Sequence, residues 1–214
     1  MTIRLALCVE GRTEKEFVDN ILSPHLERFS IYATATIVVT KHVPDGKNHT
    51  GGAVSLDRVV NDVRRLTRHF DHVSTLFDLY GFKGRHAGES ADALEARLGA
   101  AVNSRNFIPY IQRYEFEALL FARPAAAETL FGADLSQALA EIANRFANPE
   151  DINDAPETAP SRRLEALFLK HRNERFRKVV DGPLLALDIG LDAIRTRCPR
   201  FNIWLTRLES LADT

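Results

Sequence analysis

Residues 5–18 read LALCVEGRTEKEFV, and this stretch decides the fold. Its first half is an unbroken apolar run, which is typical of a central parallel strand that helices cover on both faces. We therefore predict a strand over residues 3–9, followed directly by the acid Glu10. The spacing of Thr13 and Glu16 matches a capping box, in which each side chain satisfies the other residue's backbone amide and a helix begins.

Strands and helices alternate along the first part of the chain. We predict further strands over 31–39, 72–77 and 107–113, the last one interrupted by Pro109, and helices over 54–70 and 91–102. This alternation is typical of an α/β fold with a mostly parallel sheet and flanking helices. Beyond Pro124 the strand pattern does not recur. We therefore predict an α/β domain over 1–123 and a helical extension over 124–214 packed on it, with a functional loop over the proline-bearing segment 147–161.

The composition excludes several classes of protein. Hydrophobic and charged contents of 45% and 27% are those of an ordinary globular protein, and no apolar run reaches the roughly 18 residues of a membrane span. Only Cys8 and Cys198 are present, which indicates reduced thiols and a cytoplasmic location rather than a disulfide scaffold. The net charge of −1 excludes a strongly basic DNA-binding domain, although residues 161–214 hold 11 Lys+Arg against 7 Asp+Glu.

Acidic residues follow three of the predicted strands. Glu10 follows the first, Asp78 ends the third, and Glu115 with Glu117 comes after the fourth. Because the carboxyl ends of parallel strands form the edge at which ligands bind, we expect these acids to converge. Converging carboxylates repel one another unless a cation lies between them, and Mg²⁺ or Mn²⁺ takes oxygen ligands. We therefore predict a metal site of Glu10, Asp78, Glu115 and Glu117, to which the first turn of the helix adds Glu14.

For several of these acids a purely structural explanation stays open. The helix dipole favours an acid in the first turn, which would account for Glu14 alone. An aspartate at the end of a strand is common turn chemistry, and Glu117 could be a solvated helix residue. The metal interpretation is favoured by the coincidence of positions, because the acids occupy the same end of three predicted strands. They are accompanied by Gly11, Gly81 and Gly84, which let a backbone approach a ligand closely.

The unit Glu10-Gly-Arg-Thr-Glu14 after a strand, with Asp78 ending a later strand, resembles the Toprim domain of topoisomerases, primases and OLD-type nucleases. Nearly the whole chain is similar to a group of small bacterial Toprim-like proteins. The matching segments are CVEGRTE (8–14), TLFDLYGF (75–82), YIQRYEFEALLF (110–121), PETAPSRRL (156–164) and IGLDAIRTRCPRFNIWL (189–205). The resemblance implies Mg²⁺-dependent cleavage of a phosphodiester in DNA or RNA. It also implies a partner, because such proteins are often encoded beside ABC-class ATPases, as in OLD-like phage-defence systems.

One position departs from the Toprim pattern. Toprim enzymes hold the metal with a D-x-D pair, and Asp78 matches the first aspartate, but Tyr80 stands at the second position. Either Glu115 or Glu117 compensates, or the metal site is weakened or lost. The first alternative predicts a nuclease in which Glu10 moves a proton. The second predicts a non-catalytic, regulatory partner of an ABC-class ATPase, and an enzyme acting on a small phosphate ester is a third interpretation.

Basic residues are the candidates for contact with a phosphate. OLD-like nucleases use a lysine to offset charge on the phosphate, and Lys178 is the nearest analogue by position, so we include it among the catalytic residues. Lys47, Arg85 and Arg163 are candidate substrate contacts, although the loop that holds Lys47 lacks the phosphate-loop signature. A surface or salt-bridge role stays open for each of them.

Three further residues are assigned structural roles. Cys8 has apolar neighbours, and buried thiols are usually inert. Ser161 is expected to cap the helix that follows it. Trp204 is expected to pack in the core rather than to stack on a base.

Overall fold

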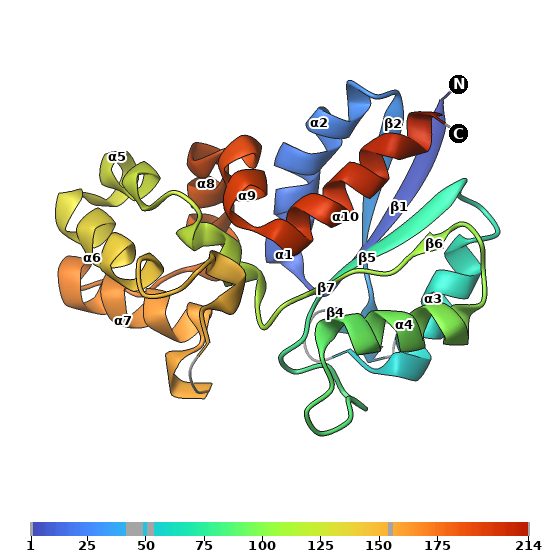
Figure 1. Ribbon diagram of the computed structural model, residues 1–214, viewed down its shortest axis with the longest axis horizontal. Helices are drawn as coiled ribbons and strands as arrows, with labels where there is room; N and C mark the ends of the chain where they lie inside the picture. Colours follow the sequence, from blue (N-terminus) through green and yellow to red (C-terminus); the bar gives the residue numbers. More distant parts are fainter. Residues whose placement is uncertain (1, 42–48, 51–53, 154–155, 214) are drawn as a thin grey trace. The chain divides into compact units, whose positions relative to one another are not determined.

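The computed structural model describes residues 2–41, 49–50, 54–153 and 156–213. The chain divides into two compact units, each shown in Figure 1. Unit 1 comprises Met1–Gln112 and Arg207–Thr214, and unit 2 comprises Arg113–Thr206. Unit 2 thus begins after Gln112, and the C-terminal segment belongs to the first unit. The predicted domain boundary at 123/124 stays a prediction.

Unit 1 is built on a parallel sheet with the strand order β2-β1-β5-β6, and β7 also pairs with β5. The apolar run of the opening stretch forms β1, in which Leu5–Val9 are fully buried between two neighbouring strands. The predicted break at Pro109 separates β6 from β7. The strands are β1 (Ile3–Val9), β2 (Ile31–Ile37), β5 (His72–Asp78), β6 (Phe107–Ile108) and β7 (Ile111–Gln112). The predicted α/β fold with a mostly parallel sheet is confirmed.

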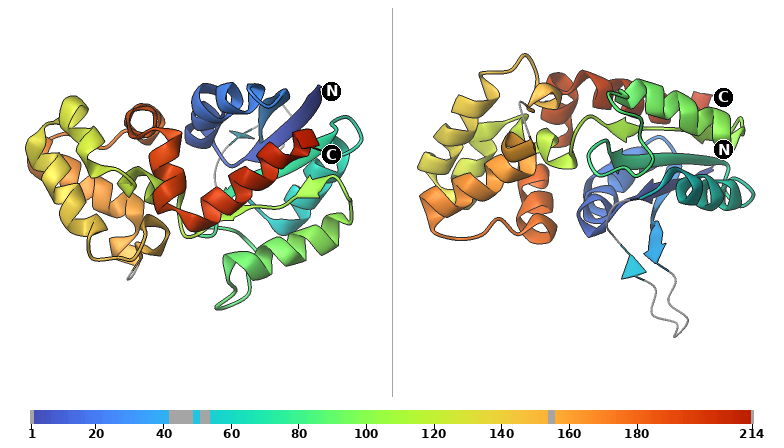
Figure 2. Two further views of the ribbon diagram at one scale, coloured as in Figure 1. Left: turned by 45° about the horizontal axis from the view of Figure 1, so that its top comes forward. Right: turned by 90° about the horizontal axis from the view of Figure 1, so that it is seen from below.

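The connections between the strands run in two opposite directions across the sheet. From β1 the chain passes outward to β2, and it then crosses back over β1 to reach β5 and β6. With right-handed crossovers, the two sets of helices cover opposite faces, as Figures 1 and 2 show. The first set is α1 (Arg12–Phe17), η1 (Val18–Leu22) and α2 (Ser23–Glu27); the second is α3 (Leu56–Leu66) and α4 (Ala91–Val102). The carboxyl ends of β1 and β5 therefore flank the topological switch point, where open α/β sheets bind ligands.

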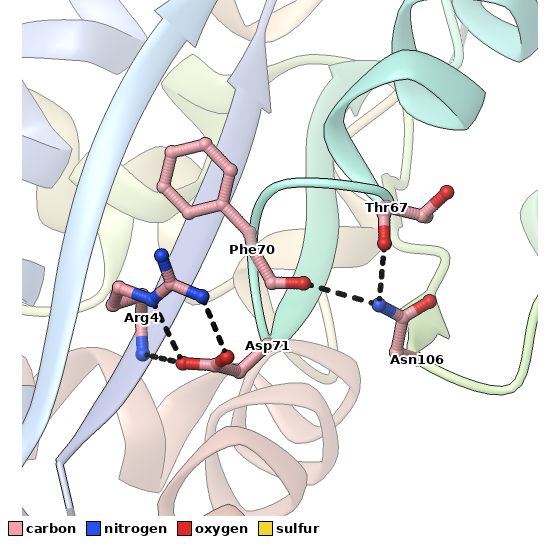
Figure 3. A network of polar contacts seen from close by, with 5 residues as sticks. All are labelled: Arg4, Thr67, Phe70, Asp71 and Asn106. Atoms are coloured by element: carbon pink, nitrogen blue, oxygen red, sulfur yellow. Dashed lines mark hydrogen bonds and ion pairs between the residues drawn. The ribbon is translucent and has the colours of Figure 1, made fainter.

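A polar network ties the amino ends of the strands together (Figure 3). The Arg4 guanidinium donates to both carboxylate oxygens of Asp71, at 3.1 and 2.9 Å, and the Arg4 backbone N–H donates at 2.8 Å. These hydrogen bonds lower the pKa of Asp71 to about 2. Asn106, just before β6, donates to the carbonyls of Thr67 and Phe70 at 3.1 and 3.2 Å. The network lies at the edge of the sheet opposite to Glu10 and Asp78.

A short antiparallel ribbon follows β2, formed by β3 (Val39–Lys41) and β4 (His49–Thr50). Lys47 lies outside the described residues, so its predicted contact with substrate stays a prediction. At the other end of unit 1, the C-terminal segment is attached to α2 by an ion pair of 2.6 Å between His25 Nε2 and Glu209 Oε1.

Unit 2 is helical, which confirms the predicted helical C-terminal part. At its centre lies η2 (Phe116–Phe121), a 3-10 helix whose six residues are all buried. The helices around it are α5 (Ala127–Phe131), α6 (Ala133–Ala143), α7 (Pro160–Arg172), α8 (Lys178–Ile189) and α9 (Leu191–Arg197); α10 (Pro199–Glu209) begins in unit 2. No helix in the described part of the chain is both long enough and apolar enough to cross a membrane.

The segment predicted as a functional loop over 147–161 has a structural role in its described part. It contains the 3-10 turns η4 (Pro149–Asp151) and η5 (Pro156–Thr158). The buried Glu150 carboxylate accepts from the backbone N–H groups of Arg200 and Phe201, at 2.8 and 3.1 Å. A carboxylate 50 residues away in the sequence therefore caps the first turn of α10.

Two of the structural roles expected from the sequence are confirmed. Cys8 is fully buried in β1, and burial raises the pKa of its thiol to about 12, so the thiolate nucleophile is suppressed. Trp204 is 3% exposed and meets Phe201 edge to face, with the ring centroids 5.4 Å apart. Both side chains belong to the core.

Candidate functional site

Glu10 and Asp78 lie at the carboxyl ends of two neighbouring parallel strands. The register pairs Val9 with Leu76, so Glu10 follows β1 beside the last residues of β5, which Asp78 ends. Both side chains are partly exposed, and both have polar partners in the protein. The structure thus brings these two predicted residues to the switch point between β1 and β5.

Glu14, the third residue of α1, closes the capping box of this helix, and the predicted capping box of Thr13 and Glu16 is wrong. The N-cap is Gly11, whose N–H donates to Glu14 Oε2 at 2.9 Å. The Glu14 side chain is only 8% exposed. Glu16 is exposed and accepts instead from Asn20 along the helix, at 3.1 Å. Because Gly11 directly follows Glu10, the Glu14 hydrogen bond also fixes the backbone beside the leading candidate residue.

The loop after β5 is held in place at several points. Lys83 donates its backbone N–H to the carbonyl of Val54 at 2.8 Å. Arg97 on α4 donates to the Gly84 carbonyl at 2.9 Å and forms a 2.7 Å ion pair with Glu89. Gly84 adopts a φ of +81°, a conformation that side chains disfavour. Tyr80, which replaces the second aspartate of the D-x-D pattern, begins this loop and is partly buried, and Arg85 is exposed on it.

In unit 2, Glu115 caps helix α7. Its carboxylate accepts from the backbone N–H of Ser161 at 2.8 Å and from the Ser161 hydroxyl at 3.1 Å. The prediction that Ser161 itself caps the helix is wrong, because the N-cap is Ala159 and Ser161 is a donor within the first turn. The negative charge of Glu115 at this helix start is favoured by the helix dipole.

Glu117 and Lys178 form a second feature of unit 2. Lys178 Nζ lies 3.1 Å from Glu117 Oε1. Glu117 is 3% exposed, whereas the side chain of Lys178 is 43% exposed. Burial raises the pKa of the Glu117 carboxyl; the positive charge of Lys178 opposes this effect, and the charge of Glu115 adds to it. A buried carboxylate with a raised pKa beside a lysine is a common arrangement at sites that move protons.

Arg163 is held by contacts within unit 2. Its Nε donates to the Thr158 carbonyl at 2.6 Å, and its guanidinium lies 5.4 Å from the centre of the Phe146 ring. A cation over an aromatic face is a stabilising contact. Arg163 therefore has a structural role within unit 2, and its predicted contact with substrate stays a prediction.

Tyr114 is a residue that sequence reasoning missed. Its φ is +65°, in the left-handed region that bulky side chains rarely adopt. It directly precedes Glu115, so its strained backbone helps to set the direction in which the chain enters the segment of Glu115 and Glu117. The sequence gives no signal for it, because left-handed turns are usually marked by glycine or asparagine.

The predicted metal ligands are divided between the units. Glu10, Glu14 and Asp78 belong to unit 1, and Glu115 and Glu117 belong to unit 2. Across the described residues, no three His, Cys, Asp or Glu side chains gather as the ligands of one ion would. The five-carboxylate shell therefore stays a prediction, and the donors at the switch point are Glu10 and Asp78.

The chain belongs to the family described as a domain of unknown function (DUF4276), whose model matches residues 9–209. No curated protein matches it. Among solved structures it is similar to the C-terminal region of the OLD protein of Xanthomonas campestris pv. campestris, phased with platinum. The identity is 14% and the TM-score 0.47, with 99% of this chain and 94% of that chain covered. The iodine-phased structure of the same region is 16% identical with a TM-score of 0.43, and 98% of this chain and 95% of that chain are covered. Homoserine dehydrogenase of S. aureus is 11% identical with a TM-score of 0.27, and 83% of this chain and 53% of that chain are covered.

Proposed function

We propose that this DUF4276 protein is a metal-dependent nuclease, or a related enzyme that cleaves phosphodiesters, with its centre at the carboxyl edge of the unit 1 sheet. The observation that carries the proposal is the position of Glu10 and Asp78 at the carboxyl ends of the two strands that flank the switch point. Ligands bind at this place in open α/β sheets. The resemblance of the segments around both residues to Toprim and OLD-type nucleases supports the same chemistry.

Glu10 and Asp78 fit a hard divalent cation that is shared with the substrate. Mg²⁺ is usually bound through one or two carboxylates together with substrate phosphates and water, rather than in a cage made only of protein ligands. When bound, Mg²⁺ or Mn²⁺ lowers the pKa of a water molecule and polarises a phosphate. Glu10 would accept the proton of the attacking water, and Asp78 would orient the site. Glu14 would support Glu10 through its hydrogen bond to the intervening backbone.

Lys178 is proposed to offset the negative charge that develops on the phosphate. Its ammonium group is half-exposed and is held at one oxygen of Glu117, so it is positioned and still accessible to an anion. We expect Lys178→Met to lower the rate of phosphodiester cleavage about 100-fold, the usual effect of losing one such group. The control is Lys170→Met, an exposed lysine on α7. An equal loss of cleavage rate in the two variants would mean that Lys178 acts only through the overall surface charge.

The central test is cleavage of single- and double-stranded DNA and RNA with Mg²⁺ or Mn²⁺. We expect Glu10→Ala and Asp78→Ala each to lower the rate at least about 100-fold, the scale of lost acid–base catalysis. Glu16→Ala is the matched control, because this exposed glutamate lies on the same helix and contacts Asn20. Equal cleavage by all four proteins would indicate a contaminating nuclease and would end the proposal.

A second candidate function is a non-catalytic, regulatory partner of an ABC-class ATPase, in keeping with an ATPase-linked phage-defence system. Tyr80 is the observation that favours it, because one carboxylate of the D-x-D pattern is missing. This function predicts no cleavage with either metal, with or without an ABC-class ATPase encoded beside the gene. It also predicts that the chain binds that ATPase and changes its rate of ATP hydrolysis. Cleavage that depends on Glu10 would exclude it.

A further inference from the structure

Helix α8 has apolar side chains on its exposed face as well as on its buried face, where Asp181 is the charged residue. Its inner face contributes Leu185, Ala186 and Ile189 to the core of unit 2, each fully buried. Its outer face is formed by Val179, Val180, Pro183, Leu184 and Leu187, which we call the α8 face. The four large aliphatic side chains of this face are 44 to 56% exposed.

The α8 face carries no charged side chain, and all twelve residues of the helix are described. Val180, Leu184 and Leu187 follow the i, i+4, i+7 spacing of one helical stripe. The two charged residues of the first turn face other partners, because Lys178 pairs with Glu117 and the buried Asp181 accepts from Arg177. Surface helices usually carry polar residues on the outer face, and a helix that is apolar all round is normally covered.

The exposed apolar side chains of the molecule are concentrated on this helix. Half of the large apolar side chains that are exposed in the described part of the chain belong to the α8 face. Single exposed apolar residues need no explanation, whereas a contiguous apolar patch marks an interaction site.

The two ends of the α8 face carry opposite charges. Arg175, three residues before the helix, is exposed, and its neighbour Glu174 pairs with Arg172. Asp188 lies in the last turn, partly exposed, and Arg123 donates to its backbone carbonyl. The helix dipole has the same sense, positive at the first turn and negative at the last. If a second copy of α8 packed antiparallel on the first, the uncharged middles of the two helices would contact each other. Arg175 of each copy would then lie near Asp188 of the other.

We propose that the α8 face is the interface of a homodimer, in which two α8 helices pack antiparallel about a two-fold axis. Arg175 of one protomer then lies beside the partner's Asp188. A two-fold interface uses the same patch on both protomers, so the patch must be complementary to itself. The uncharged centre and the opposite ends of the α8 face meet this requirement, whereas helices that bind a membrane surface line their apolar stripe with cations. The dimer is independent of the proposed nuclease activity.

The mass of the full chain in solution tests the proposal. The chain has a mass of 24.0 kDa, so light scattering coupled to size exclusion should give twice that value at micromolar concentration. Leu184→Glu combined with Leu187→Glu should give a monomer, because each protomer would bury two carboxylates in the interface. The control is Ile203→Glu, which changes an apolar side chain that is 70% exposed on α10 and should leave the dimer intact. Circular dichroism confirms that each variant is folded.

A charge exchange tests the antiparallel arrangement. Arg175→Glu and Asp188→Lys should each weaken the dimer about tenfold, and the double variant should restore the dissociation constant to within about threefold of wild type. A wild type that is monomeric at all concentrations, or a dimer that survives both glutamates, would overturn the proposal. A double variant weaker than either single one would overturn the antiparallel pairing. Glu10→Ala should dimerise like wild type, which separates this result from the outcome of the cleavage assay.

Discussion

Glu117 shows how a buried carboxylate can make stability depend on pH. Burial raises its pKa above the usual 4.5, so the folded protein binds this proton more tightly than the unfolded chain does. The stability contributed by the group is therefore present at low pH and is lost as the pH rises through the raised pKa. Lys178 is half-exposed and can turn to water if the charge of Glu117 is removed.

We therefore expect Glu117→Gln to be as stable as wild type near pH 4.5 and more stable than wild type at pH 8. The measurement is the free energy of unfolding in urea at several pH values. Glu115→Gln is the comparison, since Glu115 caps a helix rather than lying in the core. A Glu117→Gln variant that becomes less stable than wild type as the pH rises would contradict the expectation. It would show that the ion pair of Glu117 with Lys178 outweighs the cost of burying the charge.

At the scale of single residues, the sequence shows which groups can do chemistry but not which backbone groups they satisfy. Thr13-x-x-Glu16 fits the capping pattern, yet the helix starts two residues earlier, and Glu14 makes the contact. Glu115 and Ser161 are 46 residues apart, so no local pattern connects them. The placement of Glu10 and Asp78 at one edge could be predicted because it depends only on where two apolar strands end.

At the scale of elements, prediction worked where a local pattern is sufficient. The bounds of β1 and α4 agree with the prediction, because an apolar run marks the strand and a helix start marks the helix. Glu117 could have been a solvated helix residue, but it is buried in the 3-10 helix η2. The apolar pattern of so short and fully buried a segment does not distinguish a 3-10 helix from an α-helix. The cap of α10 comes from Glu150, which lies beyond the reach of any local pattern.

Glu150 gives the prediction at this scale. We expect Glu150→Ala to lower the free energy of unfolding by about 2 to 3 kcal/mol, because two backbone N–H groups at the start of α10 lose a buried charged acceptor. Chemical denaturation at pH 7 measures the loss. Glu157→Ala, an exposed glutamate in the same segment, should change stability by less than about 0.5 kcal/mol. Similar values for the two variants would show that the cap contributes little.

At the scale of the whole molecule, the fold class was predictable, whereas the contacts between segments far apart in the sequence were not. Alternating strands and helices specify a parallel sheet, because each pattern is local and each crossover has one hand. The assignment of Arg207–Thr214 to unit 1 depends on packing across the whole length of the chain. The ion pair of His25 with Glu209 joins residues 184 positions apart, and such a pairing leaves no trace in a single sequence.

This pair provides a test of the C-terminal segment. Both side chains are mostly shielded, at 14% and 11% exposure, so removing one partner leaves the other in a poorly solvated place. We expect His25→Ala and Glu209→Ala each to lower the free energy of unfolding by about 1 to 3 kcal/mol. In a double-mutant cycle the two losses should not add, with a coupling of about 1 kcal/mol. Additive losses would mean that the contact does not hold the segment.

The network of Arg4 and Asp71 determines more than the start of two strands. β1 and β5 each have seven residues, and the network anchors both at their amino ends. The register runs without a shift from the Leu5–His72 pair to the Val9–Leu76 pair, so Glu10 and Asp78 follow the last pair by one and two residues at the far edge of the sheet. A slip of one residue would send every side chain of a strand to the opposite face. Arg4 is exposed and contacts neither acid, yet its hydrogen bonds to Asp71 fix the strand register that brings Glu10 and Asp78 to the same edge of the sheet.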